Sequence, residues 1–235
     1  MLYIVGTPIG NLGDLTVRAR DVLSKADCIC AEDTRVSRVL LSHYGITAGV
    51  TAYHDFNKEK VTPRLIAMLK DGKNIAIISD AGMPGIADPA FNLVREAIRE
   101  NIPVVPVPGP SALVAALVCS GLPTDRFVFE NFLPPKSGRR RKVLESLKNE
   151  PRTVIFYETP HRIVSVLIDM DEVLGDVSVV IARELTKVFE EFLRGTPKEL
   201  LAHFAKNKPR GEMTVLVNTR VKPKSNEEPA HPSLS

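Results

Sequence analysis

A carboxylate, two glycines and a proline follow a short apolar run in the first half of the chain. The run is Ile75–Ile78, and the loop SDAGMPG that follows it carries Asp80. Four consecutive apolar residues predict a fully buried strand, and Asp88-Pro89 predicts the capped start of a helix. Ligands of open α/β sheets bind outside the carboxyl ends of the strands, and glycine lets the backbone approach a ligand closely. This loop is therefore a candidate ligand site, with an ordinary strand-to-helix turn as the alternative.

Two similar turns, GTPIGN at residues 6–11 and PGPSA at residues 108–112, also follow apolar runs that predict strands. The first has a proline between glycines four residues apart, which argues against the GxGxxG site of nicotinamide-dependent enzymes. The second opens a predicted helix, whose first backbone amides could receive a carboxylate or a hydroxyl.

A cluster of cations precedes or opens a predicted helix in the second half of the chain. Its members are Lys136, Arg139, Arg140, Arg141 and Lys142. The helix macrodipole disfavours cations at this position, so a phosphate partner explains the cluster better than a solvated charged face does. Such contacts would position a nucleic acid without reading its sequence.

The order of apolar runs and amphipathic segments predicts an α/β fold with two domains. Up to residue 120, five alternating strand–helix units favour a parallel sheet with helices on both faces. The expected strands are 2–5, 27–31, 50–54, 75–78 and 103–107, and the expected helices begin near residue 14 and cover 36–44, 61–70, 89–100 and 111–119. The turn-rich segment 120–125 marks the expected boundary between domains 1–120 and 121–220.

In the second domain, some expected strands adjoin without an intervening helix, which implies a mixed sheet. The expected strands are 127–132, 153–157, 177–182, 188–194 and 212–218, and the expected helices are 139–148, 162–174 and 196–204. Residues 221–235 are polar and rich in proline, and we expect them to form a disordered tail.

The composition bounds the class of protein. Of the 235 residues, 44% are hydrophobic and 25% are charged, which supports a real core, and a net charge of +3 neither demands nor excludes a nucleic-acid partner. Cys28 and Cys30 point to the same face of a strand and cannot easily form a disulfide, so a reducing cytoplasm is expected. With no CxxC motif, no histidine cluster and no apolar stretch of about 20 residues, we expect neither a metal site nor a membrane span.

A set of motifs spread from Leu2 to Val217 resembles a known family when it is taken in order. The motifs are VGTPIGNLGD, AEDTR, SDAGMPGIADP, PGPSA, LPPKSGRRR, YETPHR, ARELTK and RGEMTVLV. They resemble the class III S-adenosylmethionine-dependent methyltransferases, the tetrapyrrole methylase superfamily, and within it the branch that methylates cytidine 2′-hydroxyls of small-subunit ribosomal RNA. Ala90 and Asn131 depart from the pattern, since the family usually has glycine at both positions.

The resemblance implies a two-domain fold, an N-terminal parallel sheet and a C-terminal mixed sheet, that binds S-adenosylmethionine in a cleft and releases S-adenosylhomocysteine. It also implies a homodimer that acts on small-subunit (16S) ribosomal RNA, either as naked RNA or within an assembled subunit. The implied cofactor-binding residues are Pro8, Asp80, Ala81, Gly82, Ile86, Asp88, Ser111, Ala112, Tyr157, Gly211 and Glu212. Methylation of a small molecule and RNA binding without catalysis are the alternatives.

Transfer to a ribose hydroxyl needs no metal, but it needs alignment and a base that takes the proton. The charged loops supply the candidates, and the predicted catalytic residues are Lys187, Glu184, Arg35 and Glu158. A desolvated, neutral Lys187 could be the base, whereas Glu184 and Arg183 could merely pair with each other or cap an element. The remaining loop candidates are Glu32, Asp33, His161 and Arg183, and Asp33 or Thr34 could equally cap a helix. The predicted RNA-binding residues are Lys136, Arg139, Arg140, Arg141, Lys142 and Arg162.

Overall fold

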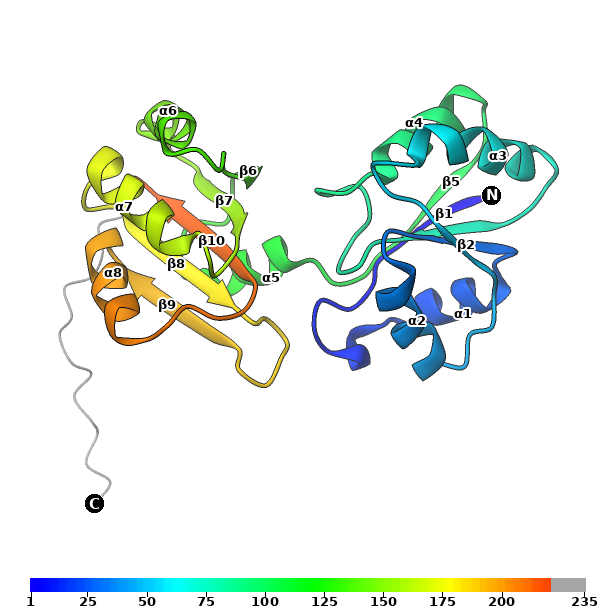
Figure 1. Cartoon of the computed structure of the whole chain (residues 1–235), viewed down its shortest axis with the longest axis horizontal. Coiled ribbons are helices and arrows are strands. Elements are labelled where there is room, and N and C mark those ends of the chain that lie inside the picture. Colours follow the sequence, from blue (N-terminus) through cyan, green and yellow to red (C-terminus); the bar gives the residue numbers. More distant parts are fainter. Residues whose placement is uncertain (221–235) are drawn as a thin grey trace, which may run out of the picture. The chain divides into compact units, whose positions relative to one another are not determined.

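The structure, a computed structural model, describes residues 1–220 and divides into two compact units (Figure 1). The first unit is Met1–Ala112, and the second begins at Leu113. The tail that we expect to be disordered, residues 221–235, lies outside the described residues.

Five parallel strands form the sheet of the first unit. They are β1 (Leu2–Val5), β2 (Cys28–Ala31), β3 (Val50–Ala52), β4 (Ile75–Ile78) and β5 (Val104–Val107), in the order β3-β2-β4-β1-β5. Every pair is parallel, which confirms the predicted sheet. Because side chains alternate along a strand, Cys28 and Cys30 enter one core and Ile29 and Ala31 the other.

Two helices cover each face of this sheet (Figure 1). The bounds are α1 Val17–Lys25 and α2 Thr34–His43 on one face, and α3 Lys58–Lys70 and α4 Ala90–Arg99 on the other. The helix expected near residue 14 is a short 3-10 turn, Leu12–Asp14, after which Leu15 is extended and Thr16 caps α1. Similarly, α4 begins at Ala90 rather than Pro89, because Pro89 occupies the cap position.

The second unit has a mixed sheet, as predicted. Its strands are β6 (Phe127–Phe132), β7 (Thr153–Glu158), β8 (Ser178–Arg183), β9 (Glu191–Gly195) and β10 (Met213–Asn218), in the order β6-β7-β10-β8-β9. The β6–β7 pair is parallel, and the other three pairs are antiparallel. The strand expected at 188–194 begins only at Glu191, because a tight turn occupies the residues before it.

Helices α6 (Ser137–Leu147), α7 (Ile163–Leu174) and α8 (Pro197–Lys206) contribute to one core with this sheet. Almost all of α5 (Ala112–Ser120) also falls in the second unit, whereas we expected the boundary after it. The reason is that Arg194 of β9 donates hydrogen bonds to the carbonyls of Cys119 and Ser120, at 2.7 and 3.2 Å. The limits of the two domains stay a prediction. Among residues 1–220, no helix is both long and apolar enough to cross a membrane.

Candidate functional site

The carboxyl ends of the five parallel strands place the predicted loops of the first unit at one edge of its sheet. Residues 6–8 follow β1, 32–33 follow β2, 54–55 follow β3, 79–80 follow β4 and 108–111 follow β5. This edge is where open α/β sheets bind ligands. The glycine and proline loops that we singled out from the sequence are therefore brought together by topology, although they lie far apart in the chain.

Three of these loops are fastened to one another through backbone groups. Thr7 and Gly82 exchange two backbone hydrogen bonds, at 2.9 and 3.1 Å, and the buried Thr7 hydroxyl lies 3.1 Å from the Ser79 carbonyl. Gly6 lies so close to Gly109 that a Cβ on Gly6 would come within 2.7 Å of the Gly109 Cα atom. The sequence analysis missed Thr7, whose only signal was its position directly after a strand and a glycine.

Asp80 links the loop after β4 to the loop after β2. Its Oδ1 atom accepts a hydrogen bond from the backbone N–H of Asp33 at 2.9 Å. Asp80 is exposed to solvent. Asp33 in turn caps α2 and binds the Arg35 guanidinium at 2.6 Å, which lowers the pKa of Asp33 to about 2. The helix-cap interpretation of Asp33 is confirmed. The Arg35 side chain is 87% exposed, so it remains accessible to a phosphate.

Asp88 closes the loop that precedes α4. Its carboxylate accepts hydrogen bonds from the N–H groups of Gly85 and Ala90, at 2.8 and 2.9 Å. Burial raises the pKa of Asp88 despite these bonds. Ile86 lies exposed inside this loop, and Gly85 adopts a φ of 90° that suits glycine alone. Asp88 thus shapes the loop with both carboxylate oxygens, and Ile86 and the backbone are its accessible parts.

Burial also raises the pKa of Glu32, with the carboxylates of Asp80 and Asp88 adding to the effect. The edge of the first sheet therefore carries more than one carboxylate in mutual repulsion, and a cationic group would relieve it. No group of side chains suited to holding a metal ion occurs among residues 1–220.

A second set of predicted residues lies along one edge of the second sheet. The strand registers align Glu158 of β7, Met213 of β10, Arg183 of β8 and Glu191 of β9 in one row. Tyr157 lies next to this row and contacts the rings of Phe129 and Phe132, with centroids 5.0 and 5.8 Å apart. The segments that continue from this row carry the remaining predicted residues of the second unit, Arg162, Glu184, Lys187, Gly211 and Glu212.

Lys187 lies between two carboxylates at this edge. Its Nζ atom is 3.0 Å from Glu184 and 3.2 Å from Glu212. Burial acts to lower the pKa of Lys187, but the two carboxylates outweigh it and raise that pKa above its ordinary value. The predicted neutral lysine base is therefore opposed by its surroundings, because a protonated amine has no lone pair with which to take a proton.

Glu184 is held in an unusual backbone conformation. Its φ is 51°, and a Cβ on the neighbouring Gly211 would overlap its carboxylate, so glycine is required there. Arg183 forms its ion pair with Glu191 at 2.6 Å rather than with Glu184, so the alternative pairing considered from the sequence is wrong. Glu184 instead accepts bonds from Lys187 and from the Glu212 N–H group.

Glu158 and Arg162 face inward. The Glu158 side chain is fully buried and lies 3.2 Å from the Arg162 guanidinium, which also donates to the Leu133 carbonyl at 2.6 Å. Burial raises the pKa of Glu158. The pair therefore fastens the segment after β6, and its burial sets it apart from groups that touch a substrate.

The basic cluster separates into two kinds of residue. Arg140 is only 3% exposed, and its guanidinium contacts the Asp169 carboxylate at 2.7 Å and the carbonyls of Pro135 and Ser165 at 3.2 Å each. Arg141 binds Asp169 at 2.8 Å and also pairs with Glu172. Arg140 is thus a correction to the predicted RNA-binding set, because it takes a core position of α6 in line with Leu144 and Leu147.

Lys136, Arg139 and Lys142 behave differently. All three are exposed, they lie three residues apart at the start of α6, and they form no ion pair within residues 1–220. These three cations, which we call the α6 basic face, remain available to phosphates. His161 is exposed as well, whereas Pro8, Ser111 and Ala112 are partly buried.

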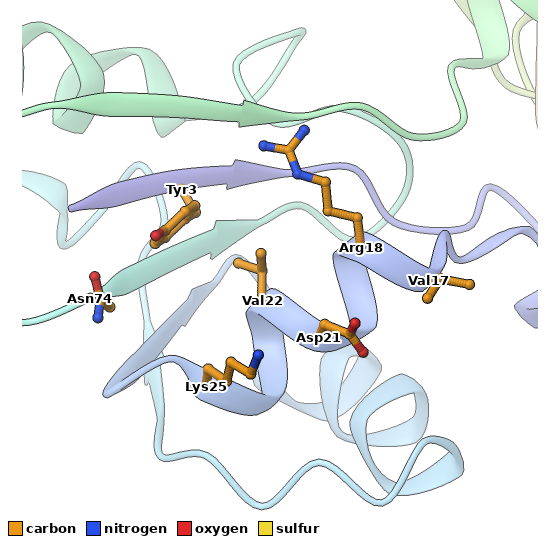
Figure 2. A pocket seen from close by; sticks show the side chains of 7 residues that line it. All are labelled: Tyr3, Val17, Arg18, Asp21, Val22, Lys25 and Asn74. Atoms are coloured by element: carbon orange, nitrogen blue, oxygen red, sulfur yellow. The ribbon is translucent and has the colours of Figure 1, made fainter.

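The first unit also has an open groove along α1, with a volume of about 480 Å³. Figure 2 shows its lining, in which Val17, Arg18, Asp21, Val22 and Lys25 come from α1 and Tyr3 and Asn74 from β1 and the start of β4. None of the predicted site residues lines it. It lies beside the strands rather than at their carboxyl ends, so we assign it no part in the candidate site.

Comparisons with known proteins agree on one family. Residues 1–201 match the family described as Tetrapyrrole (Corrin/Porphyrin) Methylases. The chain is 50% identical to "Ribosomal RNA small subunit methyltransferase I" of Thermotoga maritima, over 92% of this chain and 97% of that protein. It is also 50% identical to the protein of the same name from Escherichia coli O157:H7, over 92% of this chain and 77% of that protein.

Solved structures share the fold at low sequence identity. A cobalt precorrin-4 methyltransferase is 20% identical with a TM-score of 0.68, covering 92% of this chain and 94% of its own. A diphthine synthase is 17% identical with a TM-score of 0.74, covering 94% of this chain and 90% of its own.

Proposed function

The chain belongs to the tetrapyrrole methylase family, and from that premise we propose that it transfers a methyl group from S-adenosylmethionine to RNA. The acceptor that we propose is the 2′-hydroxyl of a cytidine in small-subunit ribosomal RNA. The relatives at 50% identity, which carry the name of a ribosomal RNA methyltransferase, support an RNA substrate. The solved structures below 25% identity include enzymes named for other substrates, so the fold by itself does not select one.

One observation supports the cofactor more than any other: three strand-end loops are locked together around glycines at the carboxyl edge of the parallel sheet. S-adenosylmethionine presents a carboxylate, an amine, a ribose and an adenine. The backbone N–H groups of Ala81 and Met83, which donate no bond within residues 1–220, suit the carboxylate or adenine, and the exposed Asp80 suits the amine or ribose. The residues present therefore fit the group, and Asp88, Gly82 and Gly85 shape the backbone that would hold it.

When bound, the sulfonium of S-adenosylmethionine supplies an already activated methyl group. The chain must then align the ribose hydroxyl and accept its proton. We propose that Glu184 is the acceptor, because its Oε2 atom takes no hydrogen bond from residues 1–220 while Lys187 and the Glu212 N–H fix its other oxygen. The protonated Lys187 would donate to a substrate oxygen, and Glu158 would act as a positioning residue through Arg162.

For the RNA backbone, we propose contacts to the α6 basic face and to Arg35. Arg162 and Arg140 would serve this surface indirectly, by fastening the carbonyls of residues 133–135 that lead into α6. A homodimer, a cytoplasmic location and the absence of a bound metal remain predictions of the resemblance.

The experiment is methyl transfer from labelled S-adenosylmethionine. The acceptors are small ribosomal subunits from cells that lack this protein and, in parallel, RNA stripped from those subunits. We expect label on one cytidine ribose, and the preferred acceptor tells whether RNA or an assembled subunit is recognised. Cofactor binding without label on either acceptor would instead support methylation of a small molecule.

Asp80→Ala tests the cofactor assignment separately. We expect weaker S-adenosylmethionine binding by calorimetry, because the variant has no carboxylate to face the amine or ribose. The matched control is Asp71→Ala, an exposed carboxylate at the end of α3. Normal cofactor affinity in the Asp80 variant would remove Asp80 from the proposed site.

A further inference from the structure

The turn between β8 and β9 exposes an aromatic side chain. Val188 and Phe189, at its tip, are 94% and 74% exposed. At the same edge of the sheet, Phe132 contacts the ring of Tyr157, whereas Phe189 makes no ring contact within residues 1–220. Phe189 is therefore the most exposed phenylalanine in the described part of the second unit, and it lies two residues after Lys187.

The backbone that carries Phe189 is strained and firmly held. Glu184 and Thr186 have φ angles of 51° and 65°, a region that a β-branched residue such as threonine rarely enters. The Thr186 N–H donates to the Glu190 carboxylate at 2.6 Å, and the Glu190 N–H donates to the Lys187 carbonyl at 3.1 Å. Strain that the surroundings maintain is characteristic of ligand sites, and here it lies in the turn that presents Phe189.

A cationic loop adjoins this turn. The segment 206–212 is tied to it by three bonds, all through Glu212. The Glu184 N–H donates to the Glu212 carbonyl at 3.0 Å, the Glu212 N–H donates to the Glu184 carboxylate at 3.3 Å, and Lys187 binds the Glu212 carboxylate at 3.2 Å. Lys208 and Arg210, in the same segment, are exposed and form no ion pair within the described residues. The segment that carries these two unpaired cations is thus bonded to the turn that carries Phe189.

We propose that Phe189, Lys208 and Arg210 form a single-stranded RNA site, in which an unpaired base stacks on Phe189 and adjoining phosphates contact the two cations. This inference rests on the proposed function, because it presumes an RNA substrate. Proteins that bind unpaired RNA combine aromatic stacking with backbone cations. A protein partner fits less well, since the cores of protein interfaces are depleted of lysine and glutamate, which surround this tip. The site would hold a nucleotide next to Glu184 and Lys187.

Two probes separate base stacking from charge: a short oligocytidylate and inorganic polyphosphate, which carries charge without bases. Phe189→Ala should weaken oligocytidylate binding by about 5- to 100-fold, the range of one stacked base, and leave polyphosphate binding unchanged. Phe189→Tyr should bind as the unchanged protein does. The matched control is Val188→Ala, which removes the neighbouring exposed apolar side chain and should alter neither affinity.

The cations should act on both probes. Lys208→Ala combined with Arg210→Ala should weaken both and reduce the slope of log affinity against log salt for RNA by about 0.7 for each phosphate that is no longer neutralised. Thermal unfolding of each variant checks that the fold is retained.

An unchanged oligocytidylate affinity for Phe189→Ala would overturn the inference, and so would an equal loss of affinity for both probes. A change of oligomeric state on sedimentation, with RNA affinity intact, would assign the tip to a second copy of the chain. If the unchanged protein methylates ribosomal RNA while Phe189→Ala does so equally well, the inference fails and the proposed function stands. If the unchanged protein does not methylate RNA, the proposed function itself fails.

Discussion

The two sheet edges that carry the predicted residues are built by different means. In the first unit, backbone hydrogen bonds and close glycine contacts fasten the loops after β1, β4 and β5. In the second unit, charged side chains do this, through the pairs of Glu158 with Arg162 and of Lys187 with Glu184, and a further buried pair, Asp169 with Arg140, joins helices α7 and α6. The first arrangement leaves backbone groups facing a ligand, and the second leaves charges. This difference agrees with the proposal of a cofactor site in the first unit and a phosphate-binding surface in the second.

The largest expected effect comes from breaking the buried ion pair between α6 and α7 of the second unit. Asp169→Ala leaves the Arg140 guanidinium buried without its carboxylate, which should lower the free energy of unfolding by about 3–5 kcal/mol. Denaturant titration measures the decrease. Arg139→Ala, one residue from Arg140 but exposed, is the control and should change stability by less than about 0.5 kcal/mol. Equal stabilities of the two variants would contradict the division of the cluster.

The contribution of the same pair to the free energy of unfolding should decrease as the pH falls. Burial acts to raise the pKa of Asp169, but hydrogen bonds from Arg141, Ser137 and Arg140 bring it below its ordinary value. The stabilisation is therefore present above the unfolded pKa of 3.8 and is lost as the pH falls through the lower folded value. The stability difference between the original chain and Asp169→Ala should shrink over that window.

Gly109→Ala tests the close backbone contact between Gly6 and Gly109 at the first edge. The added Cβ would lie 2.8 Å from the Gly6 Cα atom, and two backbones cannot easily separate, so we expect stability to fall by about 1–3 kcal/mol. Cofactor affinity should fall with it, since the loops would move apart. Gly49→Ala, where nothing lies within 4 Å of the new Cβ, should leave both quantities unchanged. Unchanged stability of Gly109→Ala would show that the Gly6 and Gly109 backbones can separate without a cost in free energy.

Lys187→Met should have a smaller effect on stability, about 1 kcal/mol or less, because the lysine is one-third exposed. The folded pKa of Lys187 is raised, so its contribution is fully present below the unfolded pKa of 10.5 and is lost as the pH rises through the folded value. Urea unfolding at neutral pH and at a pH above the raised folded pKa should therefore show a stability difference that is present at neutral pH and absent at the higher pH. Lys142→Met, which removes an exposed lysine without an ion pair, should show no such trend.

Removing cations from the α6 basic face should have the smallest effect on stability and a large effect on RNA binding. Arg139→Ala combined with Lys142→Ala removes exposed cations, so stability should change by less than about 0.5 kcal/mol. RNA affinity should fall, and its salt dependence should flatten by about 0.7 for each phosphate that the variant leaves without a cation. Cofactor affinity should not change. An unaltered salt slope would exclude this face from RNA binding.

Much of the fold followed from local patterns in the sequence. Strands such as Ile75–Ile78 are short apolar runs between turns, and helices with Thr16 or Thr196 at their start carry their caps in the sequence. Boundaries were less predictable where a side chain or a tight turn competes with the helix or strand. Asn11 stabilises a 3-10 turn where we expected a helix. The turn at residues 184–190 moves the start of β9 from the expected residue 188 to Glu191.

The candidate site was less predictable because charge alone does not reveal burial. Arg140 looked like its basic neighbours, yet it lies four and seven residues before Leu144 and Leu147, on the core stripe of α6. That spacing was a usable signal. The contacts of Thr7 with Gly82 and of Lys187 with Glu212 join residues 75 and 25 positions apart, and no local pattern encodes such pairs.

The distribution of thiols has a practical consequence. Cys28 and Cys30 lie inside the first unit at 7% exposure or less, whereas Cys119 is exposed at the end of α5, with its carbonyl held by Arg194. A maleimide dye should therefore attach at a single position of the folded protein without any engineered substitution. Fluorescence from that position would report on the second unit as RNA is added. RNA binding can therefore be followed with the native chain, labelled at Cys119.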